Sequence, residues 1–418
     1  MKSAILCIGT EMTTGLVQDI NAYFLSRNLT GEGYFTKTIL FVPDSQADIN
    51  RSLDFILGDE EIGIIIITGG LGPTDDDLTR EILAERFGKK LIFIPESWNT
   101  IVDFYQKIIN IPPPENNKKQ AYIPEGSVLL ENKVGTAPSF MIREQNKLIY
   151  VLPGVPKETE FFWQQIKKGL PRGDAHFYRS EIVKFCGIGE SQFEMNIKPL
   201  LAELPPSLKP AYLPSFGEVW FYLYSDQKNL DTVERAERVI QKIKDQYHQY
   251  LFTPFGDTLE EACGQLLCRF HLTLSTAESC TGGLLIHRLT NISGSSQYVN
   301  RGYVVYSNKA KENDLAIPEL IIQEKGAVSE EVARLLAEHV REKTGTDFGI
   351  GITGIAGPTG GLETKPVGLV YIALAEEKQT LVRKHIFSGD RIVNKTFASQ
   401  FALTYLFQAL RKKYECLP

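Results

Sequence analysis

The chain alternates between short apolar runs and longer segments in which apolar residues recur every three or four positions. The strongest run is Ile62 to Thr68 (IGIIIIT), whose β-branched residues are typical of a strand buried on both faces of a parallel sheet. Ala4 to Ile8 and Leu148 to Leu152 are shorter runs of the same kind. Helical patterns at Asp19 to Leu29 and Leu78 to Phe87 lie between the runs. This repetition predicts an α/β layered domain over about the first 170 residues.

The pattern changes after Pro171-Arg172-Gly173-Asp174, a stretch of turn-forming residues that we interpret as a linker. Strands are predicted at Glu181 to Cys186 and at Val219 to Tyr224, the second with regular alternation of side-chain type. A charged helix is predicted from Leu230 to Tyr247. Residues 171–253 are therefore expected to form a small α+β domain without obvious chemistry.

The last segment, residues 254–418, returns to alternating strands and helices. Asp257 or Thr258 is expected to cap its first helix, and Ser329 a later one. Val393, Phe397 and Phe401 share one face of the final predicted helix. Strands are predicted at residues 272–276, 303–306, 348–353 and 367–374. A second α/β domain follows from this pattern.

Composition narrows the class of protein. A chain of 418 residues with 43% hydrophobic and 23% charged residues is typical of a soluble protein with two or three cores. Its formal net charge of -6 gives no general attraction to nucleic acid, so no nucleic-acid partner is expected. No apolar stretch reaches membrane-spanning length. The six cysteines are scattered without a CxxC pair, which favours reduced thiols and a cytoplasmic location.

One loop of the C-terminal segment has the residue types of a nucleophilic site. Ser279 lies in the run Thr276-Ala277-Glu278-Ser279-Cys280-Thr281-Gly282-Gly283, between a predicted strand and the helical stretch 284–289. Such a turn presents small polar side chains and free amides where an oxyanion can be held. An ordinary turn, with Ser279 or Thr281 as the helix cap, fits the run equally well.

Lys311 follows another strand, in Tyr306-Ser307-Asn308-Lys309-Ala310-Lys311. A serine hydroxyl needs a base to become a nucleophile, and a lysine can be that base only when burial or another cation lowers its pKa. From the sequence alone, a solvated surface lysine is the simpler interpretation. His287 is an alternative base, but the eight residues that separate it from Ser279 exceed two helical turns and direct it elsewhere.

Two further loops have the features of nucleotide-binding turns. Thr353-Gly354-Ile355-Ala356-Gly357-Pro358 follows a buried strand, and glycine-rich turns of this kind suit phosphate or ribose. Arg391, in Ser388-Gly389-Asp390-Arg391, could bind a phosphate through two parallel hydrogen bonds. The alternative is that Asp390 caps the last helix and Arg391 is its exposed neighbour.

These four loops, in this order and spacing, resemble the C-terminal domain of the competence/damage-inducible protein CinA family, which is similar to the stand-alone nicotinamide-nucleotide amidase. The resemblance rests on TAESCTGG, YSNKAK, TGIAGP with KPVG, and FSGDR. It implies hydrolysis of nicotinamide mononucleotide to nicotinate mononucleotide and ammonia without a cofactor. Ser279 would be the nucleophile and Lys311 the base, with Tyr306 nearby.

The remaining roles in this domain are candidates suggested by residue type. Thr281, Gly282 and Gly283 are candidates for oxyanion or ligand donors. Thr353, Gly354 and Arg391 are candidates for binding the phosphate and ribose. Leu362, Thr364 and Lys309 depart from the residues usual in this family.

The N-terminal segment carries its own candidate site at the ends of its strands. Two loops, Gly9-Thr10-Glu11 and Thr68 to Thr79, emerge where open α/β sheets bind ligands. Glycine amides can hold phosphates, and the carboxylates of Asp75, Asp76 and Asp77 can hold a divalent cation. Acidic residues also favour a helix N-terminus without any metal.

TGGLGPTDDDLT and LPGVPKE resemble the molybdopterin-binding-like domain found at the N-terminus of the same family. The resemblance implies a metal-dependent ADP-ribose pyrophosphatase that yields AMP and ribose 5-phosphate. The expected nucleotide-site residues are Gly9, Glu11, Gly69, Gly70, Gly72 and Thr74, and the expected metal ligands are Asp75, Asp76 and Asp77. Met12-Thr13-Thr14 and Asp76 depart from the pattern of relatives.

The predicted fold class is therefore two layered α/β domains, residues 1–170 and 254–418, joined by a small α+β domain, residues 171–253. GIGES and LPSFG in the middle segment resemble the small connecting domain of this family, which would have a KH-like topology. The family resemblance also implies a homodimer that binds small nucleotides. Two rivals stay open: a non-catalytic nucleotide-binding adaptor linked to competence or recombination, and a molybdopterin-binding protein.

Overall fold

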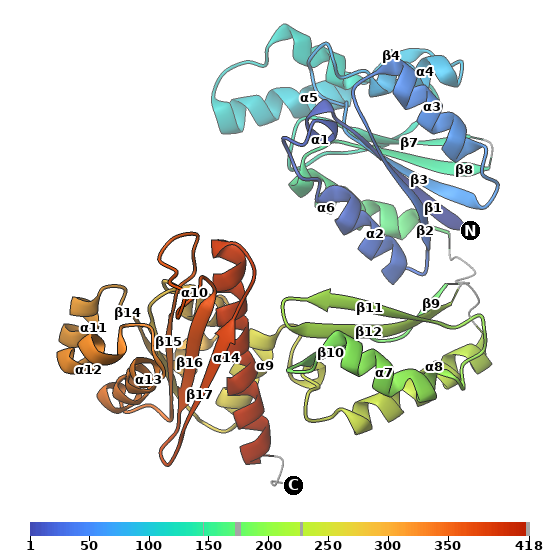
Figure 1. Cartoon of the computed structure of the whole chain (residues 1–418). Coiled ribbons are helices and arrows are strands. Elements are labelled where there is room, and N and C mark those ends of the chain that lie inside the picture. Colours follow the sequence, from blue (N-terminus) through green and yellow to red (C-terminus); the bar gives the residue numbers. More distant parts are fainter. Residues whose placement is uncertain (145, 172–176, 226–228, 415–418) are drawn as a thin grey trace. The chain divides into compact units, whose positions relative to one another are not determined.

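A computed structural model describes residues 1–144, 146–171, 177–225 and 229–414 (Figure 1). Their contacts divide the chain into two compact units, Met1–Tyr178 with Ser225–Val233, and Arg179–Tyr224 with Glu234–Pro418. Most of the predicted linker at 171–174 lies outside the described residues. Within the described ranges, no helix is long and apolar enough to cross a membrane.

The first unit is built on a six-stranded sheet with strand order β2-β1-β3-β8-β7-β6. Its parallel strands are β2 (Thr36–Val42), β1 (Lys2–Ile8), β3 (Ile62–Thr68) and β8 (Lys147–Leu152). The antiparallel strands β7 (Ser139–Glu144) and β6 (Val128–Leu130) complete one edge. Every residue of β3 is buried, because the strand is paired on both edges and covered on both faces. The prediction for Ile62 to Thr68 is confirmed.

Helices cover both faces of this sheet, as Figure 1 shows. α2 (Asn21–Gly31) and α6 (Pro156–Gly169) pack on the face that carries Ile64 and Ile66. α3 (Gln46–Leu57) and α4 (Thr79–Arg86) pack on the face that carries Ile65 and Ile67. The other elements of the unit are α1 (Thr10–Thr13), β4 (Leu91–Phe93), α5 (Pro95–Phe104), η1 (Tyr105–Ile109), η2 (Glu115–Ala121) and β5 (Tyr122–Pro124).

The middle segment forms a small sheet with two helices on one face (Figure 1). Its strands are β10 (Val183–Cys186), β12 (Glu218–Ser225) and β11 (Lys209–Ser215), with β9 (Tyr178–Arg179) paired to β12. The helices are α7 (Glu190–Leu201) and α8 (Leu230–Gln246). Alternate residues of β12 are buried, as the sequence pattern predicted. The core between this sheet and its two helices is aromatic, with Phe193 of α7 packed against Phe185 of β10 at 4.8 Å between ring centroids.

The C-terminal domain contains a five-stranded mixed sheet with order β14-β13-β15-β16-β17. β14 (Val299–Val304), β13 (Leu274–Glu278) and β15 (Phe348–Gly354) are parallel, whereas β16 (Leu369–Ala375) and β17 (Thr380–Ile386) are antiparallel to their neighbours. The predicted strand at 303–306 begins four residues earlier in the structure, and β17 was not predicted. Both are edge strands with many exposed positions, so their hydrophobic pattern is weak.

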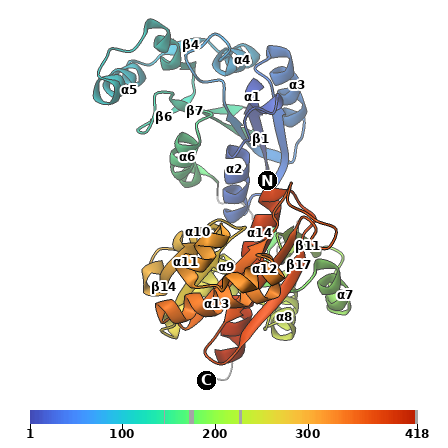
Figure 2. The same ribbon diagram turned by 60° about the vertical axis from the view of Figure 1, so that its left-hand side comes forward.

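Two helical layers cover this second sheet. α9 (Leu259–Arg269), α10 (Leu284–Thr290) and α14 (Arg391–Tyr414) share one core cluster. α13 (Glu330–Thr344) packs on the other face, and Figure 2 shows α11 (Asn308–Leu315) and α12 (Glu319–Lys325) beside it. The short η3 (Thr253–Phe255) and η4 (Ser295–Gln297) are connectors. Thr258 rather than Asp257 caps α9, and Ser329 caps α13 as predicted.

Two glycines of β15 set the distance between the sheet and α13. A Cβ on Gly349 would lie 2.1 Å from the carbonyl oxygen of Ala337, and one on Gly351 would lie 2.4 Å from that of Ala333. Both obstacles are backbone atoms of α13, so they cannot rotate away. The helix therefore rests almost directly on the strand.

We predict that Gly351→Ala lowers the free energy of unfolding by about 1–3 kcal/mol, because the added methyl group forces α13 away from the sheet. Gly189→Ala is the matched control, since nothing lies within 4 Å of its added Cβ and its φ is -77°. Thermal denaturation of both variants measures the difference. An equal melting temperature for the two would contradict this account of the packing.

Candidate functional site

Ser279 lies at the carboxyl end of β13, where neighbouring strands hold its backbone. Its amide donates to the carbonyl of Ile352 in β15 at 2.9 Å. On the other side, the amide of Val305 donates to the carbonyl of Glu278 at 2.9 Å. The side chain of Ser279 is only 7% exposed. The sheet thus places this hydroxyl at a fixed, nearly buried position.

The structure brings Lys311 to Ser279. Lys311 belongs to α11, which Ser307 caps by accepting from the amide of Ala310 at 3.1 Å. The Nζ of Lys311 lies 3.1 Å from Ser279 Oγ, and the residue is 1% exposed. The interpretation of Lys311 as a solvated surface lysine is therefore wrong.

Burial lowers the pKa of Lys311 below its usual value. The contacts of its Nζ fit an uncharged amine: the carbonyl of Val305 at 2.9 Å, the carbonyl of Tyr306 at 3.4 Å, and Ser279 Oγ. A neutral amine has two hydrogens for the two carbonyls and one lone pair that can accept from the serine hydroxyl. No described carboxylate forms an ion pair with it. This arrangement can deprotonate Ser279.

Glu278 is a site residue that the sequence analysis missed. Its buried carboxylate accepts from the amides of Gly283 at 3.1 Å, Leu285 at 3.0 Å and Ile286 at 2.9 Å. It therefore satisfies the first turn of α10, and neither Ser279 nor Thr281 caps that helix. The signal available in the sequence was an acidic residue at the end of a buried strand, which needs several donors.

The predicted oxyanion donors Gly282 and Gly283 need correction, because both amides are already engaged. Gly283 donates to Glu278, and Gly282 donates to the carbonyl of Ser279 at 3.1 Å. In the part of the loop that the structure describes, no residue accepts from the amide of Thr281, and the amide of Cys280 contacts only its own thiol. The Thr281 hydroxyl, at 0% exposure, also lacks a partner. The free donors thus directly follow the nucleophile.

Tyr306 and Arg391 come together beside Ser279 and Lys311. Arg391 donates to the Tyr306 hydroxyl at 3.0 Å and to the carbonyl of Gly357 at 2.8 Å. Asp390 accepts from the amide of Val393 at 2.9 Å, so it does cap the last helix. Arg391 is nevertheless more than an exposed neighbour, because its guanidinium joins three loops.

An open pocket of about 410 Å³ lies next to Arg391. It is lined by Ala356, Pro358, Val367, Gly389, Asp390, Arg391 and Ile392. Asn394, a second residue that the sequence analysis missed, is fully buried behind it and donates to the carbonyls of Ala356 at 3.1 Å and Gly389 at 2.9 Å. Asn394 thus holds two of the loops that form the pocket wall.

Other predicted residues occupy structural positions. The Thr353 hydroxyl donates to the carbonyl of Ala327 at 2.7 Å and the residue is 1% exposed, so its proton is already used and its role in ligand binding stays a prediction. A Cβ on Gly354 would lie 2.7 Å from the carbonyl of Leu369, which explains this glycine by packing. His287 is exposed and its ring contacts Asn291 at 3.2 Å, away from the serine.

The N-terminal loops also meet at one edge of their sheet. A Cβ on Gly69, whose φ is +98°, would lie 2.0 Å from the carbonyl of Ile8, and one on Gly70 would lie 2.1 Å from Thr79 Oγ1. The buried guanidinium of Arg80 holds the loop by donating to the carbonyls of Leu71 at 2.7 Å and Gly72 at 2.8 Å. Gly9 is buried beside this loop, and Glu11 is exposed.

The three predicted metal ligands do not converge. Asp77 accepts from the amide and hydroxyl of Thr74, at 2.9 and 2.5 Å, whereas Asp75 and Asp76 are exposed. Across residues 1–144, 146–171, 177–225 and 229–414, no group of three His, Cys, Asp or Glu side chains is arranged to hold a metal ion. The set therefore does not fit a cation held by protein groups alone, and the metal stays a prediction.

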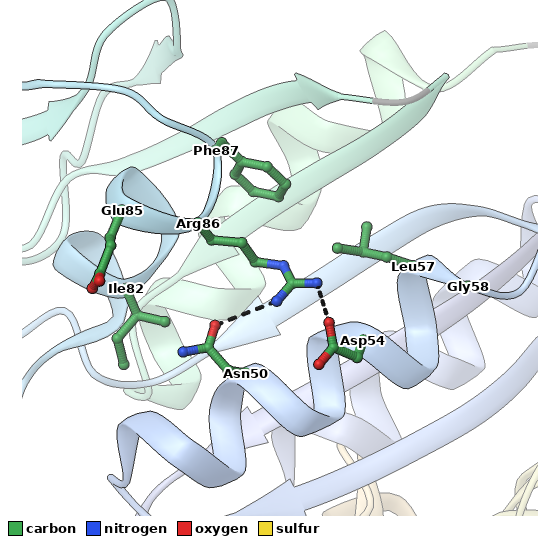
Figure 3. Close-up of a pocket in the computed structure, with 8 residues that line it drawn as sticks. All are labelled: Asn50, Asp54, Leu57, Gly58, Ile82, Glu85, Arg86 and Phe87. Atoms are coloured by element: carbon green, nitrogen blue, oxygen red, sulfur yellow. Dashed lines mark hydrogen bonds and ion pairs between the residues drawn. The ribbon is translucent and has the colours of Figure 1, made fainter.

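Another hollow, of about 650 Å³, lies between the C-terminal ends of α3 and α4 (Figure 3). Arg86 donates there to Asp54 at 2.5 Å and to Asn50 at 3.4 Å. Glu85 accepts from Gln46 at 2.9 Å. The charged groups of this hollow are thus paired with one another or with neighbours, and it contains none of the predicted site residues.

Comparisons with known proteins match nearly the whole chain. Family models match residues 4–172 (probable molybdopterin binding domain), 180–253 (damage-inducible protein CinA KH domain) and 256–410 (CinA C-terminal domain). A relative from Moorella thermoacetica, named as a competence-damage inducible protein, is 39% identical over 99% of this chain and 100% of its own length. The chain belongs to the CinA family. A CinA-like protein from Dictyoglomus thermophilum is 38% identical over 98% of this chain and 99% of its own.

Membership in the CinA family confirms the predicted fold class. The N-terminal domain resembles molybdopterin-binding domains and the middle domain is of the CinA KH type. A crystal structure of the competence/damage inducible protein CihA from Agrobacterium tumefaciens is 36% identical, with a TM-score of 0.36, and covers 37% of this chain and 93% of that one.

For this CinA family member we predict that Glu278→Gln lowers the free energy of unfolding by about 1–3 kcal/mol, because a side-chain amide cannot accept from all three backbone donors. Glu377→Gln, at an exposed position, makes the same charge change and serves as the control. Denaturant unfolding of the two variants is the measurement. If both variants unfold at the same midpoint, Glu278 does not stabilise the turn in the way described.

Proposed function

We propose that the C-terminal domain is an amidohydrolase that converts nicotinamide mononucleotide to nicotinate mononucleotide and ammonia. The observation that carries this proposal is the distance of 3.1 Å between Lys311 Nζ and Ser279 Oγ, within a group of uncharged partners. Attack on an amide needs a nucleophile and a group that first accepts and later returns a proton. Ser279 and Lys311 supply both.

In the first half of the reaction, Lys311 takes the hydroxyl proton and Ser279 Oγ bonds to the carboxamide carbon. The carbonyl oxygen then carries the negative charge. The amides of Cys280 and Thr281 are the donors we assign to it, because no other described residue accepts from them. Collapse of this intermediate breaks the C–N bond, and the protonated Lys311 gives its proton to the departing ammonia.

In the second half, water enters and Lys311 removes its proton as it attacks the ester formed on Ser279. The bond from the carbonyl carbon to Oγ breaks, and Lys311 returns the proton to the serine. The product is nicotinate mononucleotide, whose carboxyl group releases its proton to solvent, and the enzyme is restored. None of these steps requires a cofactor. A cytoplasmic location and a homodimeric assembly belong to the same proposal.

The N-terminal domain is proposed to bind a nucleotide phosphate at its glycine-rich loop. Gly69 lies so close to the carbonyl of Ile8 that no side chain fits there, which supports a loop that would contact the phosphate through backbone amides. Hydrolysis of ADP-ribose there would depend on a cation that the predicted aspartates do not hold together, so we derive no step for it. Preferential binding of molybdopterin over ADP-ribose would instead support the molybdopterin-binding rival.

We predict that Ser279→Ala and Lys311→Met each reduce ammonia release from nicotinamide mononucleotide by about a thousandfold or more. Lys311→Arg should be equally inactive, since arginine stays charged and cannot act as a base. Purified wild type and variants are compared in an ammonia assay, with calorimetry for nucleotide binding. Wild-type protein that binds the nucleotide without turnover would favour the adaptor.

We also predict that kcat/KM rises with pH through the lowered pKa of Lys311. Below that pKa the amine is protonated and cannot accept the serine proton, and above it the neutral base predominates. The midpoint of the rise should therefore lie below the ordinary lysine pKa of 10.5. A pH–rate profile with a falling limb in place of this rise would contradict a lysine base.

A further inference from the structure

Lys395 lies beside the nucleophile loop, although nothing in the sequence pattern drew attention to it. It follows Arg391 by four residues on α14, so both side chains leave the same face of the helix. Its Nζ is 3.7 Å from the point that a Cβ on Gly282 would occupy. Gly282 is exposed and has a φ of +63°. The ammonium group thus lies over the turn that follows Ser279.

The charge of Lys395 has no partner in the described part of the domain. Other cations of the domain are engaged: Arg288 pairs with Glu260 at 2.5 Å, and Lys365 donates to the carbonyl of Lys325 at 2.7 Å. Lys395 is half-buried, yet forms no ion pair or hydrogen bond with a described residue. A cation held partly out of water without a counter-charge is unfavourable unless an anion binds there.

The nearby carboxylates do not neutralise it. Glu278 is fully buried and accepts from three backbone amides. Asp390 is occupied by the amide of Val393. Burial raises the pKa of the Cys280 thiol to about 12, and the positive charge of Lys395 is close enough to act weakly in the opposite direction.

We propose that Lys395 and Arg391 together bind the phosphate group of the substrate. The proposal deepens the amidohydrolase function and rests on it. Two hydrogen bonds, to Gly357 and Tyr306, fix the plane of the Arg391 guanidinium and leave other N–H groups of the five for a ligand. Arginine matches phosphate oxygens in pairs, and lysine adds a point charge. A phosphate monoester is therefore favoured over an uncharged nucleoside.

The test compares nicotinamide mononucleotide with nicotinamide riboside, which lacks the phosphate. Lys395→Met should raise KM for the mononucleotide about tenfold or more, with little change in kcat. It should leave KM for the riboside unchanged, and Lys395→Arg should keep most of the affinity. Inorganic phosphate should compete with the mononucleotide in the wild type and less in Lys395→Met.

Lys412→Met is the matched control, because it removes the same charge from an exposed position about 25 Å further along the same helix. An unchanged KM for the mononucleotide in Lys395→Met, or an equal rise for the riboside, overturns the proposal. If the wild type releases no ammonia, the amidohydrolase function fails, and calorimetry with nicotinamide mononucleotide then decides the subsite separately. Equal affinity of wild type and Lys395→Met for nicotinamide mononucleotide would overturn the proposed phosphate subsite as well.

Discussion

The proposed chemistry depends on keeping one buried amine uncharged. The Nζ of Lys311 contacts a hydroxyl and two carbonyl oxygens, and a carboxylate in that shell would turn it into a stable cation. Glu278 is adjacent to Ser279 in the chain and could have been such a partner. Its three backbone donors direct it into the start of α10 instead. The separation of these two groups leaves Lys311 without a counter-charge, as its proposed role as a base requires.

The fold brings Ser279 and Lys311 together at the ends of two neighbouring strands. Ser279 follows β13, and Lys311 lies on α11, which follows the adjacent strand β14. Because these strands are parallel, their carboxyl ends and the loops after them lie at the same edge of the sheet. Arg391 and Lys395 reach that edge from α14, which packs on one face. The N-terminal domain repeats the principle with its glycine-rich loop after β3.

The sequence predicted the features that depend on local hydrophobic pattern and residue type. β3 was found from its apolar run, and the helix caps Thr258 and Ser329 from their residue types. The burial of Lys311 could not be predicted, because it depends on how β14 and α11 pack together. The engagement of the Gly282 and Gly283 amides, and the use of Asp77 by Thr74, likewise depend on partners fixed only in three dimensions.

The glycines of β15 place a further demand on the catalytic region. Ile352, whose carbonyl anchors the Ser279 amide, directly follows Gly351, and Gly351 is pressed against α13. The proposed nucleophile is therefore positioned through a contact between main chains that carries no reactive group. A side chain at Gly351 would collide with the main chain of α13, so a redesign of the proposed active site has to keep glycines that lie outside it.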